Sequence, residues 1–148
     1  MMKIIRTIDI LLIEDNPNDV ELTLIALQSS NLAKKIQVIR DGEEALDYLF
    51  CTGSFENRDR FDLPRLILLD LKLPKVAGIE VLEKIKSDNL FKLIPVVVLT
   101  TSKEERDLVQ CYHLGVNSYI VKPVDYQKFI TVIADISQYW LTVNELPN

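Results

Sequence analysis

Residues 10–17 read Ile10-Leu11-Leu12-Ile13-Glu14-Asp15-Asn16-Pro17, and they join the pattern of a strand to the start of a helix. Four consecutive apolar residues are typical of a strand that is buried on both faces. Asn16 is a common helix-capping residue, and proline is well tolerated in the first turn of a helix. The stretch therefore predicts a strand over 10–13, a helix that starts after Asn16, and two carboxylates in the connection between them.

The same alternation recurs along the whole chain. Apolar runs at 36–39, 66–69, 96–99 and 119–121 predict four more strands, and helices are predicted at 41–50, 79–87, 104–114 and from 125 onward. Gly115 follows the fourth helix, where a glycine commonly ends one. Strands that alternate with helices in this way predict an α/β fold with a doubly wound, five-stranded parallel sheet.

The composition argues against a nucleic-acid-binding protein, a membrane-spanning protein and a cysteine-bound metal site. The chain has 148 residues, of which 48% are hydrophobic and 26% charged, which is typical of one globular domain. The net charge of −5 argues against nonspecific binding to nucleic acid, and no apolar run approaches the ~18 residues of a membrane span. Cys51 and Cys111 lack the spacing of a metal or disulfide pair. We expect a cytoplasmic protein with reduced thiols.

The connection over residues 51–64 is long and polar. Connections inside compact domains are usually shorter than this one. The sequence leaves two alternatives open, an interaction surface or a mobile insertion.

Polar residues stand at the ends of four predicted strands. Glu14 and Asp15 follow the first, Asp70 the third, Thr100 the fourth and Lys122 the fifth. In a parallel α/β sheet the carboxyl ends of the strands border one crevice, where ligands bind. Three carboxylates in one crevice repel one another unless a cation neutralises them, and oxygen ligands suit Mg²⁺. The amine and the hydroxyl suit a phosphoryl group.

Each of these residues also has a simpler interpretation. Glu14 and Asp15 could serve only to favour the positive end of the following helix. Lys122 could be a solvated surface residue, and Thr100 an ordinary strand-end hydroxyl. Helix capping is a poor account of Asp70, because Leu71, Lys72 and Pro74 follow it. The functional interpretation fails only if all the simpler ones hold together.

Taken with Tyr119 and Pro123, these residues resemble the signature of response-regulator receiver domains. The resemblance runs from about Ile8 to about Trp140. It implies the flavodoxin-like fold known as CheY-like, with strand order 2-1-3-4-5. Only 25 residues follow Pro123, enough for one helix and a tail. We therefore expect residues 1–148 to be a single receiver domain, with a core of about 8–140, a tail at 141–148 and no output domain.

The resemblance assigns roles around Asp70. This residue would accept a phosphoryl group from the phosphohistidine of a histidine kinase. Glu14, Asp15, Asp70 and the backbone carbonyl of Lys72 would hold Mg²⁺, with Mn²⁺ as a possible substitute.

The same resemblance implies a switch. Thr100 and Lys122 would contact the phosphoryl oxygens, and the Lys122–Pro123 peptide bond would be cis. Thr100 would then move toward the phosphoryl group and leave space for Tyr119 to turn inward. We therefore expect a remodelled surface around the fourth helix, the fifth strand and the fifth helix.

Three further stretches resemble the Rcp-type regulators that pair with cyanobacterial phytochromes. They are the loop 51–64, the run Leu99-Thr100-Thr101-Ser102 and the ending Tyr139-Trp140-Leu141-Thr142. This resemblance implies a phytochrome-type kinase as phosphoryl donor and a homodimer; a non-phytochrome histidine kinase is the alternative donor. An apolar end could serve the dimer or pack on the domain's own core (Trp140, Leu141, Val143 and Leu146).

The expected function is a signalling module that acts on an unidentified downstream protein, without nucleic acid or a membrane. We expect no enzymatic activity beyond phosphoryl acceptance and slow self-dephosphorylation. A Mg²⁺-dependent aspartyl phosphatase is a weaker alternative, because its second acid would stand at the position of Lys72. A flavin-binding protein would need a phosphate loop rich in hydroxyls and glycine, where residues 14–17 carry two acids instead.

Overall fold

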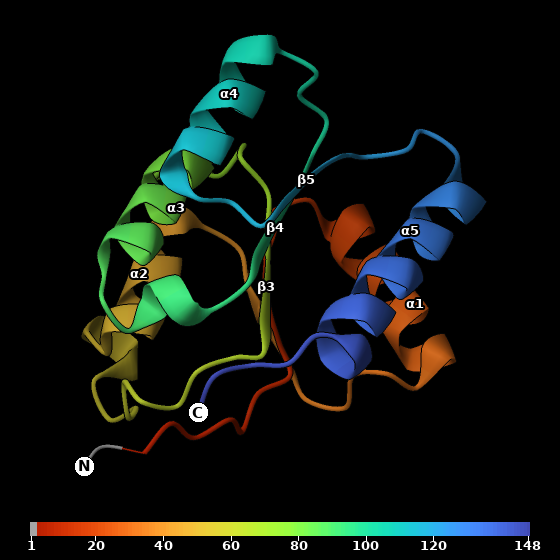
Figure 1. Ribbon diagram of the computed structural model, residues 1–148. Coiled ribbons are helices and arrows are strands. Elements are labelled where there is room, and N and C mark those ends of the chain that lie inside the picture. The colour runs from red at the N-terminus through yellow and green to blue at the C-terminus, as the bar shows by residue number, and fades with distance from the viewer. Residues whose placement is uncertain (1–2) are drawn as a thin grey trace.

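The computed structural model describes residues 3–148, which fold around a parallel sheet with helices on both faces (Figure 1). The strand order is β2-β1-β3-β4-β5, which confirms the predicted fold. The strands of the described chain are β1 (Ile10–Ile13), β2 (Ile36–Ile39), β3 (Leu66–Leu69), β4 (Val96–Thr100) and β5 (Ser118–Val121).

Two layers of helices cover this sheet. The helices α2, α3 and α4 lie on one face, and α1 and α5 lie on the other (Figure 1). Their bounds are α1 (Pro17–Ser30), α2 (Gly42–Phe50), α3 (Gly78–Ser87), α4 (Glu105–Leu114) and α5 (Tyr126–Gln138). Every predicted helix of the described chain is thus present, and each boundary that the sequence predicted lies within one residue of the observed one.

Side chains of the central strands divide between two cores. Leu11 and Ile13 of β1 enter the core beneath α2, α3 and α4, whereas Ile10 and Leu12 enter the core beneath α1 and α5. Successive strand residues point to opposite faces, so a strand covered on both sides is apolar throughout. This explains why the strand runs of the sequence do not alternate.

Side-chain caps fix where α1, α2 and α5 start. The Asn16 side chain accepts hydrogen bonds from the amides of Asn18 and Asp19 at the start of α1. Asp41 and Asp125 accept the corresponding bonds at α2 and α5. These bonds satisfy amides that lack a partner inside the helix, which confirms the predicted cap at Asn16.

The long connection after α2 is packed against its neighbours. The Arg58 guanidinium lies 3.8 Å from the centre of the Tyr48 ring and donates to the Asp62 carbonyl at 2.7 Å. Ile5 exchanges backbone hydrogen bonds with Phe61 and Leu63, each 2.8 Å long. These contacts favour an ordered connection over a mobile insertion.

The chain after α5 continues in a π-helical turn, Tyr139–Val143. Trp140 and Leu141 pack against the core beneath α1 and α5, whereas Val143 is 63% exposed. Cys51 and Cys111 are free thiols. Within residues 3–148, no helix combines the length and the apolar character that crossing a membrane requires.

Candidate functional site

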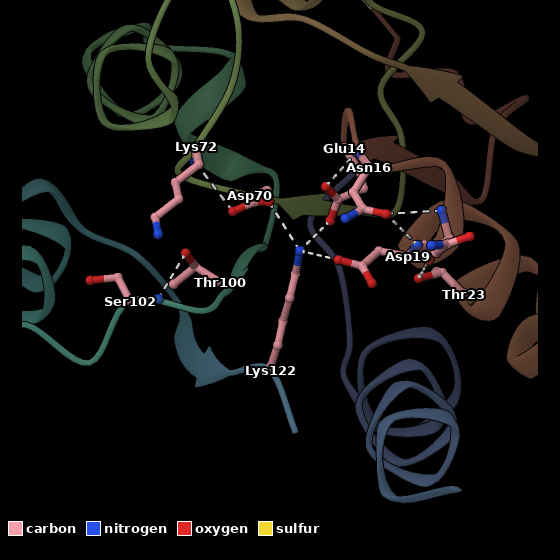
Figure 2. Close-up of polar contacts among 10 residues, drawn as sticks. Glu14, Asn16, Asp19, Thr23, Asp70, Lys72, Thr100, Ser102 and Lys122 are labelled. Carbon is pink, nitrogen blue, oxygen red and sulfur yellow. Dashed lines mark hydrogen bonds and ion pairs between the residues drawn. The ribbon is translucent and has the colours of Figure 1, made fainter. Parts of the chain in front are cut away.

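Four polar side chains meet at the carboxyl ends of the central strands (Figure 2). Glu14 follows β1, Asp70 follows β3, Thr100 ends β4 and Lys122 follows β5. All four residues are buried, with relative exposures between 0 and 8%. A buried charge is costly unless it is paired, so these residues need partners within the site.

The Lys122 amine is the centre of the site. Its nitrogen donates to Glu14 Oε1 at 2.6 Å, to Asp19 Oδ2 at 2.7 Å and to Asp70 Oδ2 at 3.0 Å. Burial lowers the pKa of Lys122, but the hydrogen bonds to Asp19 and Glu14 outweigh burial and raise it above its ordinary value. The amine is therefore charged, with one acceptor for each of its three hydrogens.

Asp70 is held from two sides. Its Oδ2 faces Lys122, and its Oδ1 accepts a hydrogen bond of 3.2 Å from the Lys72 amide. The Asp70 amide pairs with the Ile13 carbonyl of β1 at 3.0 Å, which fixes the backbone in the sheet. A Cβ atom at Gly78 would lie 2.3 Å from the Asp70 carbonyl oxygen, so the start of α3 requires glycine there. The sheet hydrogen bond and the close packing of α3 thus fix the backbone from which the Asp70 carboxylate projects.

Three carboxylates form a cluster beside the Lys122 amine. Glu14, Asp15 and Asp70 each offer an oxygen, and these oxygens lie within 4.8 Å of one another. Burial raises the pKa of Glu14 to about 7, although the hydrogen bond from Lys122 opposes the shift. Asp15 is exposed. An oxygen-only donor set fits a hard divalent cation such as Mg²⁺ or Mn²⁺.

The cluster opens to solvent through a shallow cavity of about 380 Å³. Asp15, Asp70, Lys72 and Lys122 are among the residues that line it. A carboxylate, an amine and a prospective cation site thus share one opening. This arrangement suits a reaction that moves a highly charged group to Asp70.

A second set of contacts starts at Thr100. The Thr100 hydroxyl oxygen accepts a hydrogen bond of 3.3 Å from the Ser102 amide. The Ser102 carbonyl accepts one of 3.1 Å from the Tyr119 hydroxyl, and the Ser102 hydroxyl donates to Asp107 at 2.6 Å. Burial raises the pKa of Tyr119, so its phenol remains a donor. Thr100 and Tyr119 are therefore connected through one residue.

Sequence reasoning missed Asp19 and gave Ser102 no role. Asp19 lies in the first turn of α1, where an acid is common because it complements the helix dipole. Its position in the sequence therefore carried no sign that it reaches Lys122, 103 residues away. The only available signal for Ser102 was its place two residues after Thr100.

The predicted cis bond at Lys122–Pro123 is wrong for this structure, since no peptide bond in residues 3–148 is cis. A trans bond before proline is the ordinary preference, by about 0.5–1 kcal/mol. The Lys122 amine reaches all three of its carboxylate partners from the trans backbone.

Comparison with known proteins identifies relatives of the whole domain. The family model described as response regulator receiver domain matches residues 10–134. The chain is 44% identical to the probable methanogenesis regulatory protein FilR2 of Methanothrix harundinacea, over 93% of this chain and 86% of that protein. It is 41% identical to response regulator Rcp1 of Synechocystis sp., over 93% of this chain and 92% of that protein.

Solved structures agree with these matches. The Mn²⁺-bound form of Rcp1 superposes with a TM-score of 0.88 at 40% identity, over 95% of this chain and 99% of that one. The phosphorylated cyanobacterial phytochrome response regulator RcpA gives a TM-score of 0.88 at 43% identity, with the same coverage.

Proposed function

We propose that this chain, which belongs to the response regulator receiver domain family, accepts a phosphoryl group on Asp70 and signals through contacts with other proteins. The observation that carries the proposal is the placement of Asp70 at the end of β3. Its carboxylate borders an open cavity, 3.0 Å from the buried amine of Lys122.

Asp70 would act as the nucleophile. Attack by a carboxylate oxygen on a phosphohistidine forms an O–P bond and breaks the N–P bond, and the electron pair of that bond returns to the ring nitrogen. The Lys72 amide and the Lys122 amine orient the two carboxylate oxygens before the attack. Lys122 also places positive charge where the phosphoryl oxygens gather.

Glu14, Asp15 and Asp70 would hold Mg²⁺ or Mn²⁺, with the Lys72 carbonyl as a further predicted ligand. A bound divalent cation supplies positive charge that offsets the repulsion between carboxylates and phosphoryl oxygens. The similarity to the Mn²⁺-bound form of Rcp1 supports a divalent cation in this chain.

The readout would run from Thr100 to Tyr119. A phosphorylated aspartate carries roughly −1.5 to −2 charges and presents new acceptor oxygens, by analogy with other phosphorylated side chains. The Thr100 hydroxyl would turn toward those oxygens and change its bond to the Ser102 amide. Because Tyr119 binds the carbonyl of the same Ser102, the change would reach the surface near α4 and β5.

A histidine kinase would be the phosphoryl donor, and the similarity to RcpA supports a kinase of the phytochrome type. A non-phytochrome kinase remains the alternative. We further propose a cytoplasmic homodimer that acts on a downstream protein, with the exposed Val143 near the dimer contact. Catalysis would be limited to phosphoryl acceptance and slow self-dephosphorylation.

Incubation with Mg²⁺ and acetyl phosphate tests the central claim. Intact mass should show one added phosphoryl group that hydroxylamine removes, as expected for an acyl phosphate. Asp70→Asn should abolish the adduct, whereas Asp59→Asn, in an exposed loop, should retain it. An absent adduct on the wild type, or an unchanged one on Asp70→Asn, would contradict the proposal.

Two further measurements test the proposed dimer and the proposed phosphoryl donor. Sedimentation with and without phosphorylation tests the dimer, and a monomer in both states would count against it. Phosphotransfer from a panel of purified kinases, one of them of the phytochrome type, tests the donor. Transfer from only the non-phytochrome kinases would overturn the phytochrome assignment.

A further inference from the structure

Asp19 is a fourth carboxylate in the site, and it stands apart from the prospective metal ligands. The oxygens of Glu14, Asp15 and Asp70 cluster within 4.8 Å of one another, and Asp19 is not part of that group. Its Oδ2 instead lies 2.7 Å from the Lys122 amine, on the side of α1 (Figure 2).

The Lys122 amine and a metal ion would compete for the same two carboxylates, those of Glu14 and Asp70. The amine donates to Glu14 at 2.6 Å and to Asp70 at 3.0 Å, and both carboxylates belong to the metal cluster. An oxygen that faces an ammonium group is a poorer ligand, and the positive charge repels an incoming cation. Metal binding therefore favours an arrangement in which the amine relies on an acceptor that the metal does not use.

Asp19 is the one acceptor of Lys122 that meets this condition, and it lies on a rigid part of the fold. Its amide donates to the Asn16 side chain at 3.2 Å, and its carbonyl accepts a bond of 2.7 Å from the Thr23 hydroxyl. Thr23 is only 1% exposed, so this turn of α1 is firmly packed. The carboxylate is thus held beside the amine whether or not Glu14 and Asp70 are engaged.

We propose that Asp19 is a positioning residue for the metal site. It holds the Lys122 amine when a divalent cation takes the carboxylates of Glu14 and Asp70, and so it raises metal affinity without being a ligand. This inference rests on the proposed function, since it concerns the same cation. The negative charge of Asp19 acts in the same direction, because it offsets the charge of the amine.

Titration of the purified full chain with Mg²⁺ by calorimetry, or with Mn²⁺ by electron paramagnetic resonance, measures the effect directly. Asp19→Asn keeps the size of the side chain but removes its charge, and its metal affinity should fall by about tenfold, as for other groups that support ligands. Asp19→Glu restores a carboxylate and should recover most of the loss.

Glu21→Gln is the matched control. Glu21 is exposed on the same helix and is not among the three partners of Lys122, yet the variant loses the same formal charge. Its affinity should stay within about twofold of the wild type, because solvent and salt screen an exposed charge. Equal losses in Asp19→Asn and Glu21→Gln would overturn the proposal.

A double-mutant cycle with Lys122→Met separates positioning from direct charge attraction. If Asp19 acts through the amine, Asp19→Asn should change the affinity of the Lys122→Met protein much less than that of the wild type. Equal effects in both backgrounds would overturn the proposal. Failure of the wild type to bind either metal would reject the metal site itself, whereas normal binding by both wild type and Asp19→Asn would reject only the role of Asp19.

Discussion

The hydroxyl group of Tyr119 on β5 donates a hydrogen bond of 3.1 Å to the carbonyl of Ser102 in the loop after β4. The amide of the same Ser102 donates to the Thr100 hydroxyl at 3.3 Å. The backbone amide of Ser102 thus bonds to Thr100 in the site, and its backbone carbonyl bonds to Tyr119. This gives the proposed switch a short physical route.

Tyr119→Phe should lower the free energy of unfolding by about 1 kcal/mol, the usual net contribution of one hydrogen bond. Urea unfolding measures this loss. Phosphoryl acceptance from acetyl phosphate should be unchanged, because the tyrosine does not contact Asp70. Tyr112→Phe, on the exposed surface of α4, is the control and should cost less than about 0.5 kcal/mol. Equal losses in the two variants would contradict the assigned bond.

Lys122→Met should reduce the rate of acyl-phosphate formation by about 100-fold, because the charge that faces the phosphoryl oxygens is lost. Metal binding should persist, since Glu14, Asp15 and Asp70 remain. Time-resolved intact mass gives the rate, and calorimetry gives the metal affinity. Lys128→Met, at an exposed position on α5, should react as the wild type does. A normal rate for Lys122→Met would remove Lys122 from the mechanism.

Glu14 should make the metal-free protein less stable as the pH rises. Its pKa is raised to about 7 in the folded state, from an ordinary value of 4.5, so the folded protein holds the proton more tightly than the unfolded chain. Its contribution is therefore fully present below pH 4.5 and is lost as the pH rises through 7. The difference in unfolding free energy between wild type and Glu14→Gln should shift by about 2–3 kcal/mol across this range.

Urea unfolding in the presence of a chelator, at several pH values between 4.5 and 8, measures this difference. Glu80→Gln, at an exposed position on α3, should show no such pH dependence relative to the wild type. A difference between wild type and Glu14→Gln that does not change with pH would contradict the raised pKa of Glu14.

Arg58→Ala should loosen the connection between α2 and β3. The variant loses the stacking on Tyr48 and the bond to the Asp62 carbonyl, so we expect a loss of about 2–3 kcal/mol and faster proteolysis within residues 51–64. Arg60→Ala removes a half-exposed ion pair with Asp88 and a longer contact, 4.9 Å, with the Phe91 ring, and should cost less than Arg58→Ala, about 1 kcal/mol. Equal proteolysis of wild type and Arg58→Ala would show that Arg58 does not order this loop.

Local patterns in the sequence predicted most of the fold. The run Ile10–Ile13 is apolar because both faces of its strand are covered, and the Asn16 cap satisfies amides at its own helix end. Both features depend on residues close together in the chain, so the sequence alone predicts them. The state of the 51–64 loop was not predictable, since Arg58 is held by Tyr48 and Asp62 through geometry that only the folded chain provides.

The sequence by itself determined five strands, three of them buried throughout, their connecting helices, and the charged or polar residues that end four of the strands. Only the tertiary structure decided which of these groups form hydrogen bonds and ion pairs with one another. Lys122 meets Glu14, Asp19 and Asp70 across 108, 103 and 52 residues of chain, and each contact depends on how the strands and α1 pack together. A side chain reaches only a few ångströms, so Asp19 can bind Lys122 only after packing has placed α1 beside the sheet.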